Sequence, residues 1–508
     1  MISRIYSSSC YGIEARLIDV EVDSANGLPQ ISIVGLPDQA VKESKERVRS
    51  AIKNSQFDFP PKKLTINLAP ADLKKEGPSF DLAIAIGILS SNGYINPNTI
   101  EKYIFLGELA LNGTLRKVKG ALLAASLAKA LGKTLIIPRE NSWEVSLERD
   151  ASVFCASNLK EVVQCLNDEI KLPKPDRLEI SSQSLEKTQP DFSEVKGQWF
   201  AKRAIEIACS GGHNLLMIGP PGAGKTMLAH RIPSILPPMT NDEQIEISKI
   251  YSVAGLLNHG RHEMLKRPFR APHHTISQIG LVGGGSFPRP GEISLAHLGV
   301  LFLDEFPEFH RDSIEGLRGP LEEGRIWIAR ARHNLILPAS FLLVAAMNPC
   351  PCGNLFNRKR NCKCSLPQIH KYMGKISGPI LDRIDLHVEL QALDYKDISE
   401  NSSAETSDTI LKRVIRVRSV QEKRFPENKT RLNARMNSHE IKKYCPLGNS
   451  AQKILEQAIK EMGFSARGYF KTIKIARTIA DLADSETIEA SHITEALQYR
   501  SLDRNFFG

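Results

Sequence analysis

The stretch Gly219-Pro-Pro-Gly-Ala-Gly-Lys-Thr226 decides how the second half of this 508-residue chain is expected to fold. It matches the pattern G-x-x-x-x-G-K-[ST], in which backbone N–H groups turn toward one point and the dipole of the next helix adds to them. The apolar run LLMI before it predicts a strand, and MLAHRI after it predicts a helix. Together these features predict a loop that binds nucleotide phosphates. The loop consists of Gly219, Pro220, Pro221, Gly222, Ala223, Gly224, Lys225 and Thr226.

Phosphate binding, Mg²⁺ binding and activation of water are expected of the last two residues of this loop and of an acidic pair later in the sequence. Lys225 would reach the β- and γ-phosphates, and the Thr226 hydroxyl would ligate Mg²⁺. Val300-Leu-Phe-Leu-Asp304-Glu305 reads as a buried strand that ends in two carboxylates. Asp304 would hold Mg²⁺ through water, and Glu305 would activate the attacking water. Alone, the pair fits a core strand with an acidic turn, but beside the phosphate loop it predicts ATP hydrolysis.

Three later polar residues extend this series. Asn348 ends the apolar run Phe341 to Met347, Arg383 lies in ILDRID, and Arg467 lies in SARG before a helix. An amide there would orient the attacking water, and arginines would stabilise transition-state charge, in trans if subunits form a ring. A lone Asn or Arg is usually structural, so the ordered series carries the prediction.

Outward from the loop, short apolar strands alternate with helices, which predicts an α/β core with a parallel sheet. Upstream, strand-like and helical runs also alternate, which predicts a mixed α/β domain. We expect four parts: a first domain at 1–171, a linker at 172–195, an ATPase core at 196–400 with a cysteine insertion at 350–364, and a helical lid at 401–508.

Composition and charge limit the classes of protein. Hydrophobic residues make up 42% and charged residues 24%, which is ordinary globular usage. No apolar run reaches about 18 residues and the start resembles no signal peptide, so we expect a cytoplasmic protein without membrane contact. The net charge is +10, and residues 191–508 hold 43 Lys and Arg against 34 Asp and Glu. This basic excess favours a polyanionic partner such as DNA.

Four of the nine cysteines are clustered as Cys350-x-Cys352-x₉-Cys362-x-Cys364. Four soft ligands suit a tetrahedral Zn²⁺, although the C-x-C spacing is tighter than the commoner C-x₂-C. A structural Zn²⁺ is the favoured interpretation. Reduced free thiols and a redox pair are the alternatives.

Several basic residues lie where loops are expected and are candidates for DNA contact. Phe269 to His297 holds a glycine-rich loop, and 325–337 reads as a hairpin with a basic tip. His273 and His274 of the first loop are expected to serve packing or nucleotide sensing rather than metal binding. A solvated turn is the alternative for each loop. The candidates are Arg289, Arg330, Arg332, Arg358, Lys359 and Arg360.

Taken together, these motifs resemble those of the magnesium-chelatase branch of AAA+ ATPases. FRAPHHTIS, PRPGEISLAHLGVLFLDE, AAMNPCPCGN and IARTIADL are similar to the ComM (YifB) family over almost the whole chain. The resemblance implies a bacterial cytosolic hexameric ATPase, a helicase-type motor that promotes DNA branch migration during recombination in natural transformation. It also implies that Asn348 is sensor 1, Arg383 the arginine finger and Arg467 sensor 2, with Arg477 as a competitor for the last role.

The first domain resembles the proteolytic domain of Lon proteases, which have the ribosomal protein S5 domain 2-like fold. Glu76-Gly-Pro-Ser79 corresponds to the nucleophile segment, and GELALNGTLRKVKGALLAA to the segment that follows. A Ser–Lys dyad needs a lysine base. Ala121 occupies its position here, and Lys119 lies two residues early. A non-catalytic scaffold is therefore expected.

The sequence leaves three other functions open. A metal-insertion or protein-remodelling motor, as in magnesium chelatase, would require partner subunits. An ATP-dependent protease would require Ser79. A non-catalytic DNA-binding module would work without Lys225.

Overall fold

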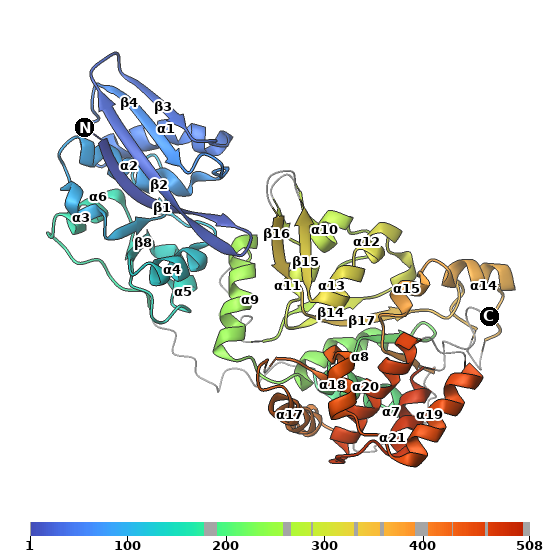
Figure 1. Cartoon of the computed structure of the whole chain (residues 1–508). Helices are drawn as coiled ribbons and strands as arrows, with labels where there is room; N and C mark the ends of the chain where they lie inside the picture. Colours follow the sequence, from blue (N-terminus) through green and yellow to red (C-terminus); the bar gives the residue numbers. More distant parts are fainter. Residues whose placement is uncertain are drawn as a thin grey trace. The chain divides into compact units, whose positions relative to one another are not determined.

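A computed structural model of the chain describes residues 2–176, 190–257, 266–285, 288–329, 334–355, 360–391, 405–428, 430–462 and 466–500 (Figure 1). The chain divides into two compact units. The first comprises Met1–Ser182 with Asn241–Gly260, and the second comprises Gln183–Thr240 with Arg261–Gly508. No helix among the described residues is long and apolar enough to cross a membrane.

The first unit is built on a seven-stranded mixed sheet in the order β3-β4-β2-β1-β5-β8-β9. Its long hairpin pairs β1 with β2 antiparallel, and Ile18, Val20 and Val22 of β2 are fully buried in alternation with more accessible residues. This period of two is what a strand with one core face requires. The strands are β1 (Ile2–Tyr11), β2 (Glu14–Ala25), β3 (Gln30–Val34), β4 (Lys63–Ala69), β5 (Tyr103–Phe105), β8 (Thr134–Pro138) and β9 (Val153–Ala156), with a small pair β6 (Glu108–Leu109) and β7 (Leu115–Arg116).

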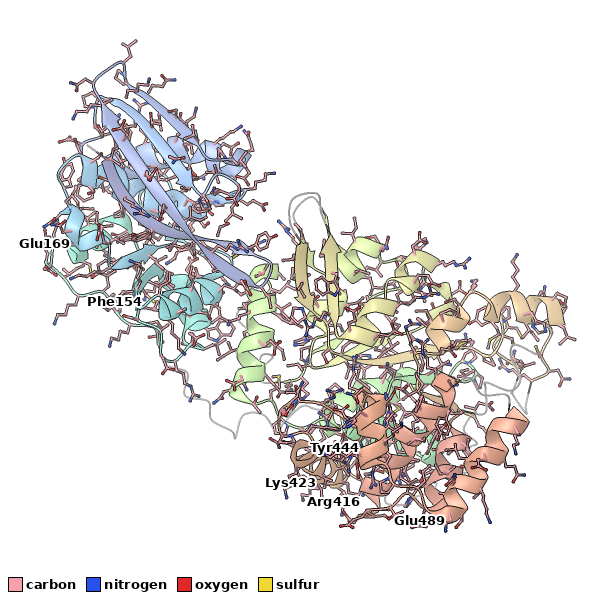
Figure 2. The ribbon with its side chains drawn as sticks, in the orientation of Figure 1. Phe154, Glu169, Arg416, Lys423, Tyr444 and Glu489 are labelled. Atoms are coloured by element: carbon pink, nitrogen blue, oxygen red, sulfur yellow. The ribbon has the colours of Figure 1, made fainter. Side chains whose placement is uncertain are left out.

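Helix α2 (Asp81–Ser91) is buried from Asp81 to Ser90 and packs on β1, β2 and α1 (Gln39–Asn54). Asp81 accepts hydrogen bonds from the Nε of Arg47 at 2.8 Å and from Ser44, while burial raises the pKa of this carboxyl. Phe154, labelled on β9 in Figure 2, packs half-buried against the same core. The other helices are α3 (Pro97–Ile100), α4 (Ala121–Ala130), α5 (Ser142–Val145) and α6 (Leu159–Leu166), with a 3-10 turn at Pro78–Phe80.

The helix α9 (Asn241–Ala254) belongs to the first unit, although the sequence analysis placed all of 196–400 in the ATPase core. It packs on α4, and the Ser252 hydroxyl donates a hydrogen bond to the buried carboxylate of Glu144. The Nζ of Lys117 donates to the carbonyl of Leu257 at 2.6 Å. The sequence shows an apolar face on this helix but not which unit covers it.

The second unit contains a five-stranded parallel sheet in the order β11-β14-β17-β10-β18. Every residue of β10, β14 and β17 is buried, as expected for parallel strands covered on both faces. The predicted α/β class with a parallel-sheet core is confirmed. The strands are β10 (Leu215–Ile218), β11 (Phe269–Arg270), β14 (Val300–Leu303), β17 (Leu342–Met347) and β18 (Leu386–Glu389).

Helices and two hairpins surround this sheet. The hairpins pair β12 (Gly283–Gly284) with β13 (Arg289–Pro290), and β15 (Arg325–Ala329) with β16 (Asn334–Pro338). The core helices are α7 (Trp199–Gly211), α8 (Lys225–Arg231), α10 (Gln278–Val282), α11 (Glu292–Leu295), α12 (Arg311–Glu315), α13 (Arg318–Glu323), α14 (Leu366–Met373) and α15 (Gly378–Leu381). Short 3-10 turns lie at Phe192–Glu194, Ile232–Ile235, Phe306–Glu308 and Asn433–Arg435.

The helical lid was predicted as a separate domain, but it shares one unit and one hydrophobic core with the ATPase core. In Figure 1 its orange and red helices gather beside the green α7, and α17 and α20 contact α7. Glu489, labelled in Figure 2, caps α21 through a capping box with His492. The lid helices are α17 (Ser407–Arg424), α18 (Ser438–Tyr444), α19 (Asn449–Met462), α20 (Ala466–Leu482) and α21 (Ala490–Gln498).

Candidate functional site

The phosphate loop lies between β10 and α8, where the carboxyl end of a central strand meets a helix N-terminus. Gly222 and Gly224 have φ values of 80° and 87°, a left-handed backbone that glycine adopts without strain. The Nζ of Lys225 donates to the carbonyls of Gly219 at 2.6 Å and Pro220 at 3.0 Å, and to Oδ1 of Asn348 at 3.2 Å. Burial lowers the pKa of Lys225, while Asp304 acts in the opposite direction. The loop thus holds its cation at the point where phosphates would bind.

Asp304 and Asn348 meet the loop because β14, β17 and β10 are parallel neighbours. Their carboxyl ends lie at one edge of the sheet, the usual ligand edge of such folds. The hydroxyl of Thr226 donates to Oδ2 of Asp304 at 2.7 Å. A hydroxyl and a carboxylate oxygen at this distance are the hard donors that Mg²⁺ prefers. The residues predicted as Mg²⁺ ligands therefore fit that ion.

Glu305 follows with a left-handed backbone, φ 51° and ψ 43°, so its side chain leaves the line of the strand. Its Oε2 lies 3.1 Å from Nδ1 of His274. The His274 ring stacks against His273 with 4.1 Å between ring centroids and has Phe309 at its edge. The sequence marked His274 for packing or nucleotide sensing but gave no sign of this contact with Glu305.

The two predicted arginines, Arg383 and Arg467, converge on one carboxylate. Oε1 of Glu322 on α13 lies 2.6 Å from NH2 of Arg383 and 3.1 Å from NH2 of Arg467. Arg435 also donates to the carbonyls of Leu321 and Glu322. Sequence reasoning missed Glu322, since nothing local marks a carboxylate at a helix C-terminus as a partner of distant arginines.

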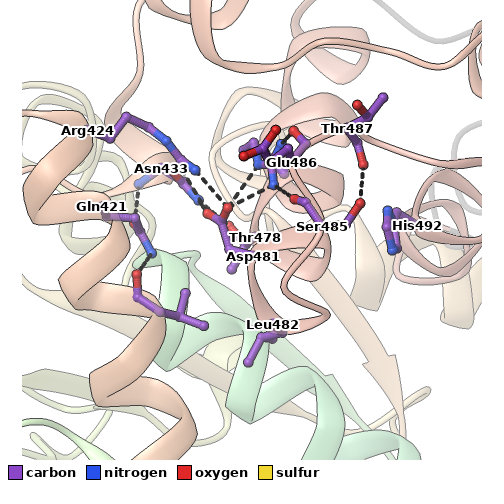
Figure 3. A network of polar contacts seen from close by, with 12 residues as sticks. Gln421, Arg424, Asn433, Thr478, Asp481, Leu482, Ser485, Glu486, Thr487 and His492 are labelled. Carbon is purple, nitrogen blue, oxygen red and sulfur yellow. Dashed lines mark hydrogen bonds and ion pairs between the residues drawn. The ribbon is translucent and has the colours of Figure 1, made fainter.

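Arg477, the competitor for the sensor 2 role, is buried inside the lid. Asp481, Ser485 and Glu486, which contact it, are labelled in Figure 3. The guanidinium of Arg477 donates to Oδ1 of Asp481 at 3.0 Å and to the carbonyls of Ser485 and Glu486. Asp481 also accepts two bonds from Arg424, at 2.7 and 2.8 Å. This network occupies the hydrogen-bond donors of Arg477, so the side chain serves the lid.

The four clustered cysteines converge on one point beside the nucleotide site. Their Sγ atoms lie within 4.8 Å of one another, and none is in a disulfide. Cys350 is fully buried three residues after the end of β17, and Cys364 lies two residues before α14. Backbone N–H groups of Lys363 and Asn354 near its Sγ lower the pKa of Cys352 to about 6.

The candidate DNA-contact residues are only partly within the described chain. Arg289 is exposed on β13. Arg360, the first described residue after 356–359, is also exposed. The predicted hairpin at 325–337 forms as β15 and β16, with Trp327 57% exposed. Four candidates lie outside the described residues: Arg330, Arg332, Arg358 and Lys359.

In the first unit, Ser79 lies in the 3-10 turn Pro78–Phe80, where its carbonyl accepts the N–H of Gly107 at 2.9 Å. The Lys119 side chain lies against Gly255, just beyond α9, and the buried Lys75 donates to the carbonyl of Pro70. Ala121, at the position of the Lon lysine, begins α4 and cannot accept a proton. Non-catalytic behaviour of this unit stays a prediction.

Comparison with known proteins agrees with this geometry. Three family models match: "Subunit ChlI of Mg-chelatase" at residues 20–141, "Magnesium chelatase, subunit ChlI" at 191–398, and its C-terminal part at 404–500. The chain is 44% identical to Competence protein ComM of Haemophilus influenzae, over 98% of this chain and 97% of that protein. It is 43% identical to YifB of Escherichia coli, over 99% and 98%.

A weaker similarity links the chain to a protease. Lon protease 2 of Bacillus subtilis is 27% identical over 207 residues, which cover 36% of this chain and 37% of the protease. The match agrees with a Lon-like fold for part of the chain. Because the other similarities extend over almost the full length, this chain belongs to the ComM/YifB family, whose core follows the magnesium chelatase family model.

Proposed function

We propose that the protein is an ATP-driven, ring-forming DNA translocase of the helicase type that promotes branch migration in homologous recombination. The single observation that carries the ATPase part is the meeting of Lys225, Asn348, Thr226 and Asp304 at one sheet edge. The DNA part is supported by the similarity to a protein named as a competence protein, and we place the chain's action in natural transformation as part of the proposal. The proposed setting is the bacterial cytoplasm.

Each side chain of the site has a defined task in this reaction. Lys225 exchanges the loop carbonyls for the β- and γ-phosphates of ATP. Thr226 and Asp304 would hold Mg²⁺, which neutralises phosphate charge when bound. Asn348 orients a water, and the Glu305 carboxylate takes its proton as the water oxygen bonds to the γ-phosphorus. The bond from that phosphorus to the β–γ bridging oxygen breaks, so ADP and inorganic phosphate leave.

The ring part of the proposal assigns Arg383 to a neighbouring subunit's nucleotide and Arg467 to the nucleotide of its own chain. Both guanidinium groups form ion pairs with the carboxylate of Glu322 in this structure, so each must exchange that carboxylate for a phosphate. Arginine supplied to a developing phosphate charge accelerates such reactions by about 10³ to 10⁵. A homo-hexamer is the proposed assembly.

The proposed partner is DNA in single-stranded, forked or junction form, with recombination proteins as further partners. The basic excess of residues 191–508 supports an electrostatic contact with phosphates. The exposed Trp327 on the β15–β16 hairpin offers a ring for base stacking, which is worth about 1–3 kcal/mol per base. We also propose a structural Zn²⁺ on the four clustered cysteines.

A second candidate is a metal-insertion or protein-remodelling motor. The match of three magnesium chelatase family models favours it. Such a motor would hydrolyse ATP without regard to DNA and would need partner subunits.

A labelled four-way junction with movable arms tests the proposal. Wild-type protein with ATP and Mg²⁺ should convert the junction into two duplexes, and Glu305→Gln should bind ATP without converting it. A nonhydrolysable ATP analogue should give no product with either chain. If the wild-type protein hydrolyses ATP but leaves every junction intact, branch migration is wrong and the second candidate takes its place.

A further inference from the structure

The spacing of the four clustered sulfurs fits one shared metal ion. The Sγ of Cys350 lies 3.4 Å from that of Cys352 and 3.6 Å from that of Cys362, and Cys352 and Cys362 are also 3.6 Å apart. A tetrahedral Zn²⁺ with Zn–S bonds of about 2.3 Å separates its sulfurs by about 3.8 Å. A disulfide would bring two of them to about 2.05 Å. The three distances lie within about 0.4 Å of the edge of a tetrathiolate site and far from the length of a disulfide bond.

The backbone around the cluster is arranged as in thiolate sites. The N–H of Cys364 points at Sγ of Cys362 with 3.4 Å between nitrogen and sulfur. Gly353, with φ 76°, turns the chain so that its N–H donates to the carbonyl of Cys350 at 2.9 Å. Hydrogen bonds to ligand sulfurs fix the ligands and adjust their basicity.

The cluster also touches the nucleotide site. Cys350 lies two residues after Asn348, whose amide oxygen accepts the bond from Lys225. A Cβ on Gly353 would lie 2.6 Å from Cδ of Pro221, so the cysteine loop packs directly on the phosphate loop. A movement of the cysteine loop would therefore act on both Asn348 and the phosphate loop.

One cleft is lined both by Glu305 and Asn348 and by two of the four clustered cysteines. It has a volume of about 750 Å³, and Glu305, Asn348, Cys352, Cys364 and Tyr372 are among the residues that line it. Tyr372 is buried on α14, the helix that begins after Cys364, and burial raises the pKa of its phenol to about 12. A metal that joins the segment after β17 to the start of α14 would fix part of the wall of the cleft that Glu305 also lines.

We infer that a Zn²⁺ ion on Cys350, Cys352, Cys362 and Cys364 positions Asn348 against the phosphate loop, so that metal occupancy sets the rate of ATP hydrolysis. This inference rests on the proposed ATPase function. The cysteines act through Asn348 and Pro221 and are positioning residues. Loss of the metal should lower kcat and leave ATP affinity nearly unchanged, because Lys225 and the loop glycines remain.

Purified full-length protein tests the metal centre directly. Elemental analysis should give one zinc per chain, and replacement by Co²⁺ should give the visible absorption of tetrahedral thiolate coordination. Cys352→Ser and Cys362→Ser should both lose zinc. Cys165→Ser changes a half-buried cysteine of the first unit and serves as the matched control, which should keep the zinc.

The coupling is tested by turnover in the same proteins. The two cluster variants should bind a fluorescent ATP analogue within about twofold of wild type and hydrolyse ATP about 10- to 100-fold more slowly. Chelation of wild-type zinc should reproduce the loss, and added Zn²⁺ should restore the rate, which tests the inference even if a variant fails to fold.

Three results would overturn the inference. If zinc-free variants hydrolysed ATP at the wild-type rate, zinc would not set that rate, and the proposed ATPase function would still stand. Loss of ATP binding together with the metal would assign zinc to the folding of the whole core. If the zinc-loaded wild-type protein hydrolysed no ATP with any DNA, both the dependence on zinc and the proposed function would be wrong.

Discussion

The Nδ1 of His274 lies 3.1 Å from Oε2 of Glu305, and both side chains keep contact with solvent, 30% and 58% exposed. The left-handed backbone of Glu305 aims its carboxylate at the ring, and the stack with His273 limits how the ring turns. The histidine therefore fixes the direction of the carboxylate to which the proposed mechanism assigns the proton of the attacking water.

His274→Ala should lower kcat for ATP hydrolysis by about 10- to 100-fold with little change in KM, because a misdirected base costs turnover rather than binding. His439→Ala, at an exposed position on α18, is the control and should keep the wild-type rate. Steady-state kinetics on the two variants checks this. Equal rates for His274→Ala and wild type would contradict the role given to the ring.

Arg467 and Arg477 should respond differently to the same substitution. Arg477→Ala removes a buried cation from Asp481 and should lower lid stability by about 3–5 kcal/mol. Arg467→Ala loses only a half-exposed pair with Glu322, so thermal stability should stay unchanged while turnover falls about tenfold or more. Thermal unfolding and ATPase rates measured on both variants separate the two roles. A catalytic loss without a stability loss in Arg477→Ala would reverse the assignment.

Arg383 should act on the nucleotide of a neighbouring chain. Arg383→Ala should bind ATP and hydrolyse it poorly, and Lys225→Ala should not bind it at all. Mixing the two inactive proteins should recover part of the hydrolysis rate. In a mixed assembly, Lys225 of an Arg383→Ala chain can meet Arg383 of a Lys225→Ala chain, and that interface has a complete nucleotide site. No recovery in mixed assemblies that size measurements confirm would mean that Arg383 works within its own chain.

Asp385 links the sheet to the lid and makes stability depend on pH. Its Oδ1 lies 2.6 Å from Nζ of Lys471 on α20, with His213 nearby. Burial alone would raise the pKa of Asp385, but Lys471 and His213 outweigh burial and hold the pKa well below its usual value. A carboxyl with a lowered folded-state pKa stabilises the fold above its unfolded pKa of about 3.9, and this contribution is lost as pH falls through the folded value.

Asp385→Asn should therefore lower stability by about 3–5 kcal/mol near neutral pH, since it leaves Lys471 buried and unpaired. The difference from wild type in thermal unfolding should persist from about pH 5 to 8 and shrink below about pH 4. Asp408→Asn, at an exposed pair with Lys412, is the control and should change little. A difference that grows toward low pH would contradict the assignment.

The local chemistry of the nucleotide site could be predicted because its signals are short-range. Glycine placement marks the phosphate loop, and four apolar residues before Asp304 mark a buried strand. Parallel pairing then brings Asp304 and Asn348 to the loop, since strand ends of one sheet share an edge.

The placement of α9 and the partners of Glu322 and His274 could not be predicted, because they depend on contacts between distant parts of the chain. Ser252 lies 108 residues from Glu144, and Arg467 lies 145 residues from Glu322. The apolar spacing of α9 shows that one face is buried, but it does not show that the first unit covers that face. A carboxylate such as Glu322 or a ring such as His274 has no sequence signal of its own, because its role comes from the partner that folding supplies.

ATP hydrolysis by the full-length protein, measured without DNA and with single-stranded DNA, duplex and a four-way junction, tests the central claim most directly. Wild type should be stimulated several-fold, most by forked and junction DNA, and Glu305→Gln should show no turnover under any condition. A wild-type rate that is the same with and without every DNA would contradict the account of a DNA motor.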